Sequence, residues 1–159
     1  MPTNMQRLTG VLVSIGITVG GAWVASTAHS NTEDKTLTSF ADGLNITVEN
    51  VRNDSGNVVV MVFADRDAFK AYDVTKAAGY IEIPSKQGSV SARFPDLNSG
   101  PDAVAAFHDE DQNQDLKMDG EQPIEGYATS GAVDAYDVST FKKASLSNPN
   151  TAITMYYAD

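Results

Sequence analysis

Residues 58–64 read VVVMVFA, and the prediction of the fold starts from this run. It is continuously apolar and rich in β-branched valine, which is typical of a central strand in a sheet. The preceding residues 53–57, NDSGN, are all of types common in tight turns. We therefore predict a strand at 58–64 that follows a short connection.

The flanking sequence contains further short strands and one candidate helix. Residues 44–51 alternate apolar and polar side chains, as a half-buried strand does, whereas 103–107 (AVAAF) form a second buried run. Residues 67–78 (DAFKAYDVTKAA) predict a short amphipathic helix that ends at Gly79. The remaining predicted strands are 80–83 and 89–94, which form a hairpin, and 143–147 and 151–157.

This order of elements predicts the fold class. About seven short strands, frequent turns and one short helix indicate an all-β antiparallel β-sandwich of immunoglobulin-like or transthyretin-like character. The strands span a single domain, 43–159.

The N-terminus has the pattern of an export signal. Arg7 precedes an apolar stretch, 8–24 (LTGVLVSIGITVGGAWV), and Ser26-Thr27-Ala28 is a small-x-small cleavage pattern. We predict a signal peptide at 1–28, a disordered leader at 29–42 and a periplasmic or secreted protein. The alternative is an uncleaved signal anchor, but the apolar stretch is shorter than the ~20 residues that a membrane span needs. The chain has no Cys, which excludes disulfides.

The charge balance restricts the possible partners. Residues 1–28 contain Arg7 and no acid, so cleavage leaves 21 acids and 11 − 1 = 10 bases, a net charge of −11. Such a chain is not expected to bind nucleic acid or, once cleaved, a membrane surface. A net negative charge of this size favours solubility, cation binding or a saline habitat, and we expect a monomer.

The most acidic segment is 108–119, HDEDQNQDLKMD. Oxygen-bearing side chains recur at every second residue, and between 102 and 125 the only base is Lys117. Ca²⁺ binds ~6–8 oxygens from such side chains, backbone carbonyls and water, whereas Mg²⁺ requires a stricter geometry. The predicted ligands of a structural Ca²⁺ are Asp109, Asp111, Asn113, Asp115, Asp119 and Glu121.

The segment departs from an EF-hand in two positions. The spacing of the first four ligands fits, but Gln114 occupies the position of the turn glycine, and Gly120 that of the closing carboxylate. Because a strand precedes the segment, we predict a Ca²⁺ loop at a strand end instead. The alternative interpretation is a solvated acidic turn.

Three further residues are candidates around this loop. His108 is expected to donate to a loop carboxylate and so to orient a metal ligand, and Glu125 to ligate the ion or hold the turn. His29 would become the N-terminal residue after cleavage and could bind Cu²⁺ through its amine and imidazole.

The run 103–131 carries a family resemblance through His108-Asp109-Glu110, Leu116, Asp119, Pro123 and Glu125-Gly126-Tyr127. It resembles the signature of a bacterial family known as domain of unknown function 2141, and the resemblance extends over most of 43–157. The sequence differs at Gln114, where the family has a loop glycine, and at 99–102, where it has Gly-x-Tyr. The resemblance implies an exported β-sandwich with no established activity.

Together these observations predict an exported, soluble binding or accessory protein with a Ca²⁺-stabilised loop and an unknown protein or small-molecule partner. Two alternatives stay open: a copper carrier or oxidative copper enzyme that uses His29, and a carrier of a small hydrophobic ligand. Catalysis has no support, because the sequence contains no Ser-His-Asp motif, Cys nucleophile, H-E-x-x-H or C-x-x-C.

Overall fold

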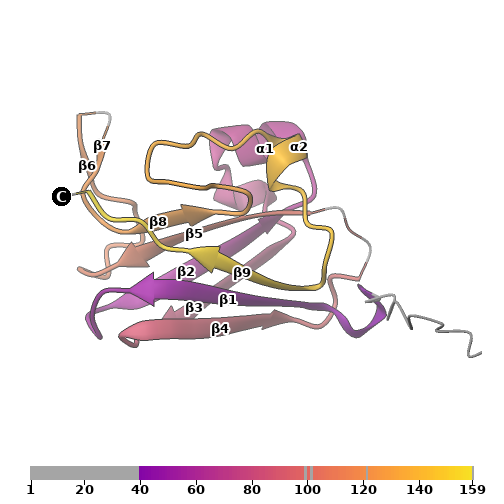
Figure 1. Ribbon diagram of the computed structural model, residues 1–159, viewed down its shortest axis with the longest axis horizontal. Helices are drawn as coiled ribbons and strands as arrows, with labels where there is room; N and C mark the ends of the chain where they lie inside the picture. The colour runs from indigo at the N-terminus through magenta and orange to yellow at the C-terminus, as the bar shows by residue number, and fades with distance from the viewer. Residues whose placement is uncertain (1–39, 99, 101, 121, 159) are drawn as a thin grey trace, which may run out of the picture. The chain divides into compact units, whose positions relative to one another are not determined.

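The computed structural model describes residues 40–98, 100, 102–120 and 122–158 (Figure 1). The predicted signal peptide 1–28 and most of the predicted leader lie outside this range. The last residues of that leader form a short 3-10 helix, η1 (Phe40–Asp42), and Phe40 packs against the core. Within the described range, no helix is long and apolar enough to cross a lipid bilayer.

Two sheets make up the domain. The strands are β1 (Leu44–Val51), β2 (Asn57–Phe63), β3 (Gly79–Pro84), β4 (Gly88–Phe94), β5 (Ala103–Asp109), β8 (Tyr127–Thr129) and β9 (Asn150–Thr154), with a small hairpin of β6 (Met118–Asp119) and β7 (Gln122–Pro123). One sheet has the order β4-β1-β9 and the other β3-β2-β5-β8. The predicted all-β, sandwich-like fold is confirmed.

Two features depart from the predicted strand pairing. The predicted hairpin of 80–83 and 89–94 does not form, because β3 pairs with β2 and β4 pairs with β1, in different sheets. β1 pairs with β4 in antiparallel orientation, but with β9 in parallel, in the register Asn45↔Asn150 to Glu49↔Thr154. Parallel neighbours need a long crossover between them. Here the rest of the domain provides it, since β1 is the first strand and β9 the last.

The continuous apolar runs arise because the central strands are buried on both faces. Val58, Val60 and Val62 of β2 face β1 and β4 and belong to the core between the sheets. Val59, Met61 and Phe63 face the opposite side, where two short helices, α1 (Arg66–Ala71) and α2 (Phe141–Ala144), cover the four-stranded sheet (Figure 1). The helices therefore make a third layer.

The predictions for both helical segments, one as a longer helix and one as a strand, were wrong in part. α1 is shorter than the predicted 67–78, because Tyr72 adopts a left-handed conformation (φ 49°) and ends the helix, after which Asp73 caps a separate 3-10 helix, η2 (Val74–Lys76). The predicted strand 143–147 begins inside α2 instead, where the Thr140 hydroxyl accepts a hydrogen bond from Lys143 N and caps the helix.

The end of β5 determines where the acidic loop lies. Successive side chains of β5 point alternately into the core between the sheets and toward the face that the helices cover. This alternation continues to the last two residues, so His108 lies on the side of the core between the sheets and Asp109 on the other side. An isolated bridge between Tyr127 and Tyr156 joins the two sheets nearby, with both N–H···O bonds made (2.9 and 2.8 Å). The loop therefore starts beside a hydrogen-bonded junction between the two sheets.

Candidate metal centre

A chain of hydrogen bonds fixes His108, which is fully buried. Its Nε2 lies 2.7 Å from the carbonyl oxygen of Ser55, so Nε2 carries the hydrogen and donates it. Its Nδ1 lies 2.9 Å from the hydroxyl of Tyr157, which in turn accepts from the backbone N–H of Arg52 (3.0 Å). This pattern fits a neutral imidazole whose two nitrogens are both engaged.

His108 therefore contacts a carbonyl and a phenol rather than the carboxylate that we expected. The carboxylate oxygen Glu110 Oε1 lies 3.8 Å from His108 Nδ1, which is too long for a hydrogen bond. Through its own contacts His108 holds the turn between β1 and β2 and the C-terminal segment against the start of the loop.

Asp109 shapes the loop from the inside. Its side chain is fully buried, and its two oxygens accept the backbone N–H groups of Asn113 (3.0 Å) and Gln114 (2.9 Å). The Asn113 side chain then accepts from Asp115 N (2.7 Å). These contacts wind the loop tightly around the Asp109 carboxylate.

The loop makes its sharp bend without glycine. Gln114 occupies the position of the missing turn glycine and has φ 64°, and Gln112 has φ 58°. Gln114 thus adopts the left-handed conformation that the turn glycine of an EF-hand would supply. A left-handed conformation costs a non-glycine residue roughly 1–2 kcal/mol, which the hydrogen bonds to Asp109 offset.

Strand register brings Glu125 opposite Asp109. Phe107 pairs with Tyr127 in the β5–β8 ladder, and His108 N donates to Gly126 O (2.8 Å), so the next residues on each side face each other. Glu125 is 3% exposed, and its two oxygens accept from the backbone N–H groups of Glu110 (3.1 Å) and Lys117 (3.0 Å).

Three carboxylates meet at this point. One oxygen from each of Asp109, Asp111 and Glu125 lies within 4.8 Å of the others. Two unit negative charges ~4 Å apart repel by about 4 kcal/mol near a protein surface, and burial raises the cost. In the described part of the chain, neither Asp109 nor Glu125 forms an ion pair; Asp111, 42% exposed, lies 3.5 Å from Lys117 Nζ.

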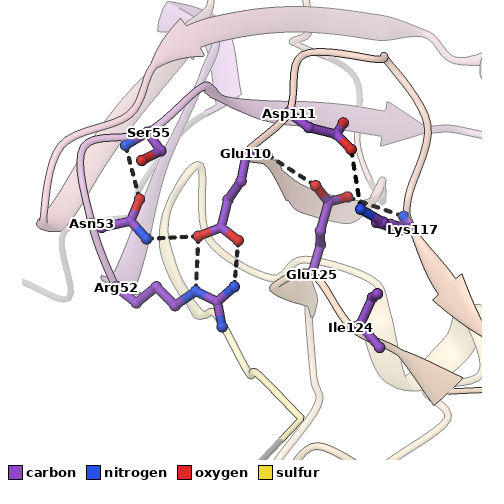
Figure 2. Close-up of a pocket in the computed structure, with 8 residues that line it drawn as sticks. All are labelled: Arg52, Asn53, Ser55, Glu110, Asp111, Lys117, Ile124 and Glu125. Carbon is purple, nitrogen blue, oxygen red and sulfur yellow. Dashed lines mark hydrogen bonds and ion pairs between the residues drawn. The ribbon is translucent and has the colours of Figure 1, made fainter.

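Glu110 points away from this group toward the turn between β1 and β2 (Figure 2). It binds the Arg52 guanidinium with both oxygens and accepts from Asn53 Nδ2 (2.7 Å). The hydrogen bond from Arg52 is the main reason that the pKa of Glu110 lies below its ordinary value. This ion pair ties the acidic loop to the turn.

A cleft of about 480 Å³ opens between the turn and the loop (Figure 2). Its lining mixes both signs of charge with one apolar side chain and consists of Arg52, Asn53, Ser55, Glu110, Asp111, Lys117, Ile124 and Glu125. The residues from the turn lie far from the loop in sequence, and no local pattern indicates them.

The structure brings together only some of the predicted ligands. Asp109 and Asp111 join the three-carboxylate group, whereas Asp115 and Asp119 are exposed and do not belong to it. Asn113 supports the turn, and Glu125, expected to have a supporting or ligating role, is one of the three. The predicted ligand Glu121 and the copper candidate His29 lie outside the described residues.

The comparisons with known proteins identify a family. Over residues 46–155 the chain matches the model of the family described as "Uncharacterized protein conserved in bacteria (DUF2141)". Because the match covers more than half of the 159 residues, the chain belongs to this family. No curated protein and no solved structure matches the chain.

Proposed function

We propose that this chain is an exported binding or accessory protein whose acidic loop binds Ca²⁺ as a structural ion. The observation that carries the proposal is the meeting of two buried carboxylates, Asp109 and Glu125, with Asp111, within 4.8 Å and with backbone N–H groups as the main partners. A divalent cation would neutralise the repulsion that these charges otherwise impose.

The donor set favours Ca²⁺ over other metals. All three side chains offer oxygen, which suits a hard cation, and both nitrogens of the adjacent His108 are engaged elsewhere. The loop is irregular, and Ca²⁺ tolerates irregular coordination with ~6–8 oxygens better than Mg²⁺ does. Water and backbone carbonyls would supply the remaining ligands.

The ion would link the loop to the rest of the sandwich. Asp109 belongs to β5 and Glu125 lies just before β8, while Asp111 lies on the loop itself. Binding would hold the segment between them in one conformation beside the cleft. Loops at one end of a sandwich commonly recognise partners, so an ordered loop here suits a binding role.

Thermal unfolding of chelator-treated protein tests the ion site. Ca²⁺ at ~100 times its Kd should add roughly 2.7 kcal/mol of stability, which raises Tm by several degrees. Asp111→Asn should remove this rise without unfolding the protein, because the Asp111 side chain is 42% exposed and the substitution keeps its size.

Asp119→Asn is the matched control, since it removes one exposed acid of the same sequence region from outside the three-carboxylate group. It should keep the rise. An equal rise with NaCl at the same ionic strength would mean that the loop is merely a solvated acidic surface.

Export rests on the N-terminal sequence, where 8–24 are apolar and 26–28 form the cleavage pattern. N-terminal sequencing of the protein recovered from the periplasm or medium should give His29 as the first residue. Recovery of uncleaved chain from the membrane fraction would contradict this part of the proposal.

A further inference from the structure

The cleft beside the carboxylate group has the size of a small-molecule site. Its volume of about 480 Å³ lies within the ~300–1,000 Å³ common for ligand pockets. Asp111 and Glu125 belong both to the cleft wall and to the three-carboxylate group, so an ion bound there would border the cleft (Figure 2).

The two basic side chains of the cleft, Arg52 and Lys117, differ in how strongly other side chains already bind them. Arg52 is held by Glu110 in a two-pronged pair and stacks on the Tyr157 ring, with the guanidinium carbon 4.6 Å from the ring centre. Lys117 is 53% exposed, and its ammonium has a long contact, 3.5 Å, to Asp111. An ion that coordinates Asp111 would weaken that contact and leave the Lys117 ammonium available in the cleft.

We propose that the cleft binds a small organic carboxylate, with a carboxylate oxygen coordinating the bound Ca²⁺ and the Lys117 ammonium pairing with the ligand's negative charge. This inference rests on the Ca²⁺ site proposed above. Three protein carboxylates do not fill the ~6–8 positions of Ca²⁺, and a hard cation prefers a charged oxygen ligand. The half-exposed side chain of Ile124 offers an apolar contact for the carbon skeleton.

Tb³⁺ in place of Ca²⁺ provides the first readout, because its luminescence lifetimes in H₂O and D₂O report how many waters remain on the ion. Succinate is the probe, and succinamide is its uncharged control. Succinate should displace water from the protein-bound ion, and succinamide should not. Sulfate tests whether any small anion suffices.

Calorimetric titration of succinate into Ca²⁺-loaded protein, at a fixed free Ca²⁺ concentration, tests Lys117. Lys117→Gln should weaken succinate binding roughly two- to fivefold, as expected for loss of a partly exposed charge pair. It should leave Ca²⁺ affinity unchanged or higher, because the contact from Lys117 to Asp111 competes with the ion. Lys142→Gln, an exposed lysine on α2, is the control of equal charge and should bind succinate like the wild type.

The outcomes separate the two proposals. If the ion binds but succinate displaces no water, or if succinamide or sulfate acts equally well, the carboxylate site is overturned and the Ca²⁺ site stands. If neither Ca²⁺ nor Tb³⁺ binds, the proposed function fails and the carboxylate site fails with it.

Discussion

Replacing Tyr157 by Phe removes a single oxygen atom where three segments of the chain meet. The hydroxyl bonds to His108 Nδ1 at 2.9 Å and accepts from the backbone N–H of Arg52 at 3.0 Å. The substitution keeps the ring, and with it the stacking of Arg52 at 4.6 Å and the edge-on contact with the His108 ring. It therefore isolates the hydrogen bonds from the packing.

The expected cost follows from burial. His108 is fully buried, so its Nδ1 would lose its partner without access to water, which costs about 1–3 kcal/mol. The N–H of Arg52 lies in an exposed contact and can bond to water instead, which costs little. We expect Tyr157→Phe to lower the free energy of unfolding by about 2 kcal/mol.

Urea unfolding followed by fluorescence or circular dichroism measures this loss, and the m-value should not change. Tyr156→Phe is the control, because the described residues contain no hydrogen-bond partner for that hydroxyl, and its effect should stay within about 0.5 kcal/mol. A loss below about 0.5 kcal/mol in Tyr157→Phe would refute the argument that His108 depends on this hydroxyl.

Three further predictions concern the same end of the sandwich. A Cβ on Gly126 would overlap the ring of Tyr157, so Gly126→Ala should destabilise the protein by about 1–3 kcal/mol in thermal unfolding. The same substitution should cost much less in a Tyr157→Ala background, and equal losses in both backgrounds would contradict the steric cause. Gln114→Gly should stabilise the chelator-treated protein by up to about 1 kcal/mol, since glycine adopts φ 64° without strain and the Gln114 side chain makes only an exposed 3.3 Å hydrogen bond, to Glu82. Destabilisation would mean that the strain at Gln114 is smaller than the entropic cost of glycine together with that hydrogen bond. Because Arg52 holds the pKa of Glu110 below its ordinary value of 4.5, the contribution of the ionised pair is fully present above that pH and is lost as pH falls through the lower, folded-state pKa. Glu110→Gln should therefore be less stable than wild type near neutral pH, and the difference in free energy of unfolding should narrow below about pH 4.5. Urea unfolding over a series of pH values measures this difference, and a difference that stays constant down to about pH 2 would contradict the linkage.

The central strands were predictable because their chemistry is local. The runs 58–64 and 103–107 are apolar at consecutive positions, and both form strands of the four-stranded sheet, buried between the other sheet and the helices. The parallel pairing of β1 with β9 was not predictable in this way. It depends on which edge the last strand reaches after the chain has crossed the domain.

In the helical segments, the spacing of apolar residues was not enough to predict where each helix begins and ends. Residues 67–78 have an amphipathic pattern, but the left-handed Tyr72 and the cap by Asp73 divide them into α1 and η2. Single-residue conformations of this kind are set by tertiary contacts as well as by residue type. The same applies to α2, a four-residue helix with a threonine cap, whose last two residues were predicted to begin a strand.

In the candidate site, too, residues close in sequence were predictable and contacts between distant segments were not. Asp109 and Asp111 were recognisable from their spacing, whereas the closeness of Glu125 comes from the register of β5 against β8. Asp119 has the right chemistry in sequence but lies in β6 with its side chain exposed. The contribution of Arg52 depends on the turn between β1 and β2 reaching the loop.

Calorimetric titration of Ca²⁺ into the chelator-treated protein decides whether Asp109, Asp111 and Glu125 form a calcium site. We expect one Ca²⁺ per chain, loss of binding in Asp111→Asn, retention in Asp119→Asn, and much weaker binding of Mg²⁺. Absence of bound Ca²⁺, or binding that Asp111→Asn leaves intact, would contradict the claim that these three carboxylates form a calcium site.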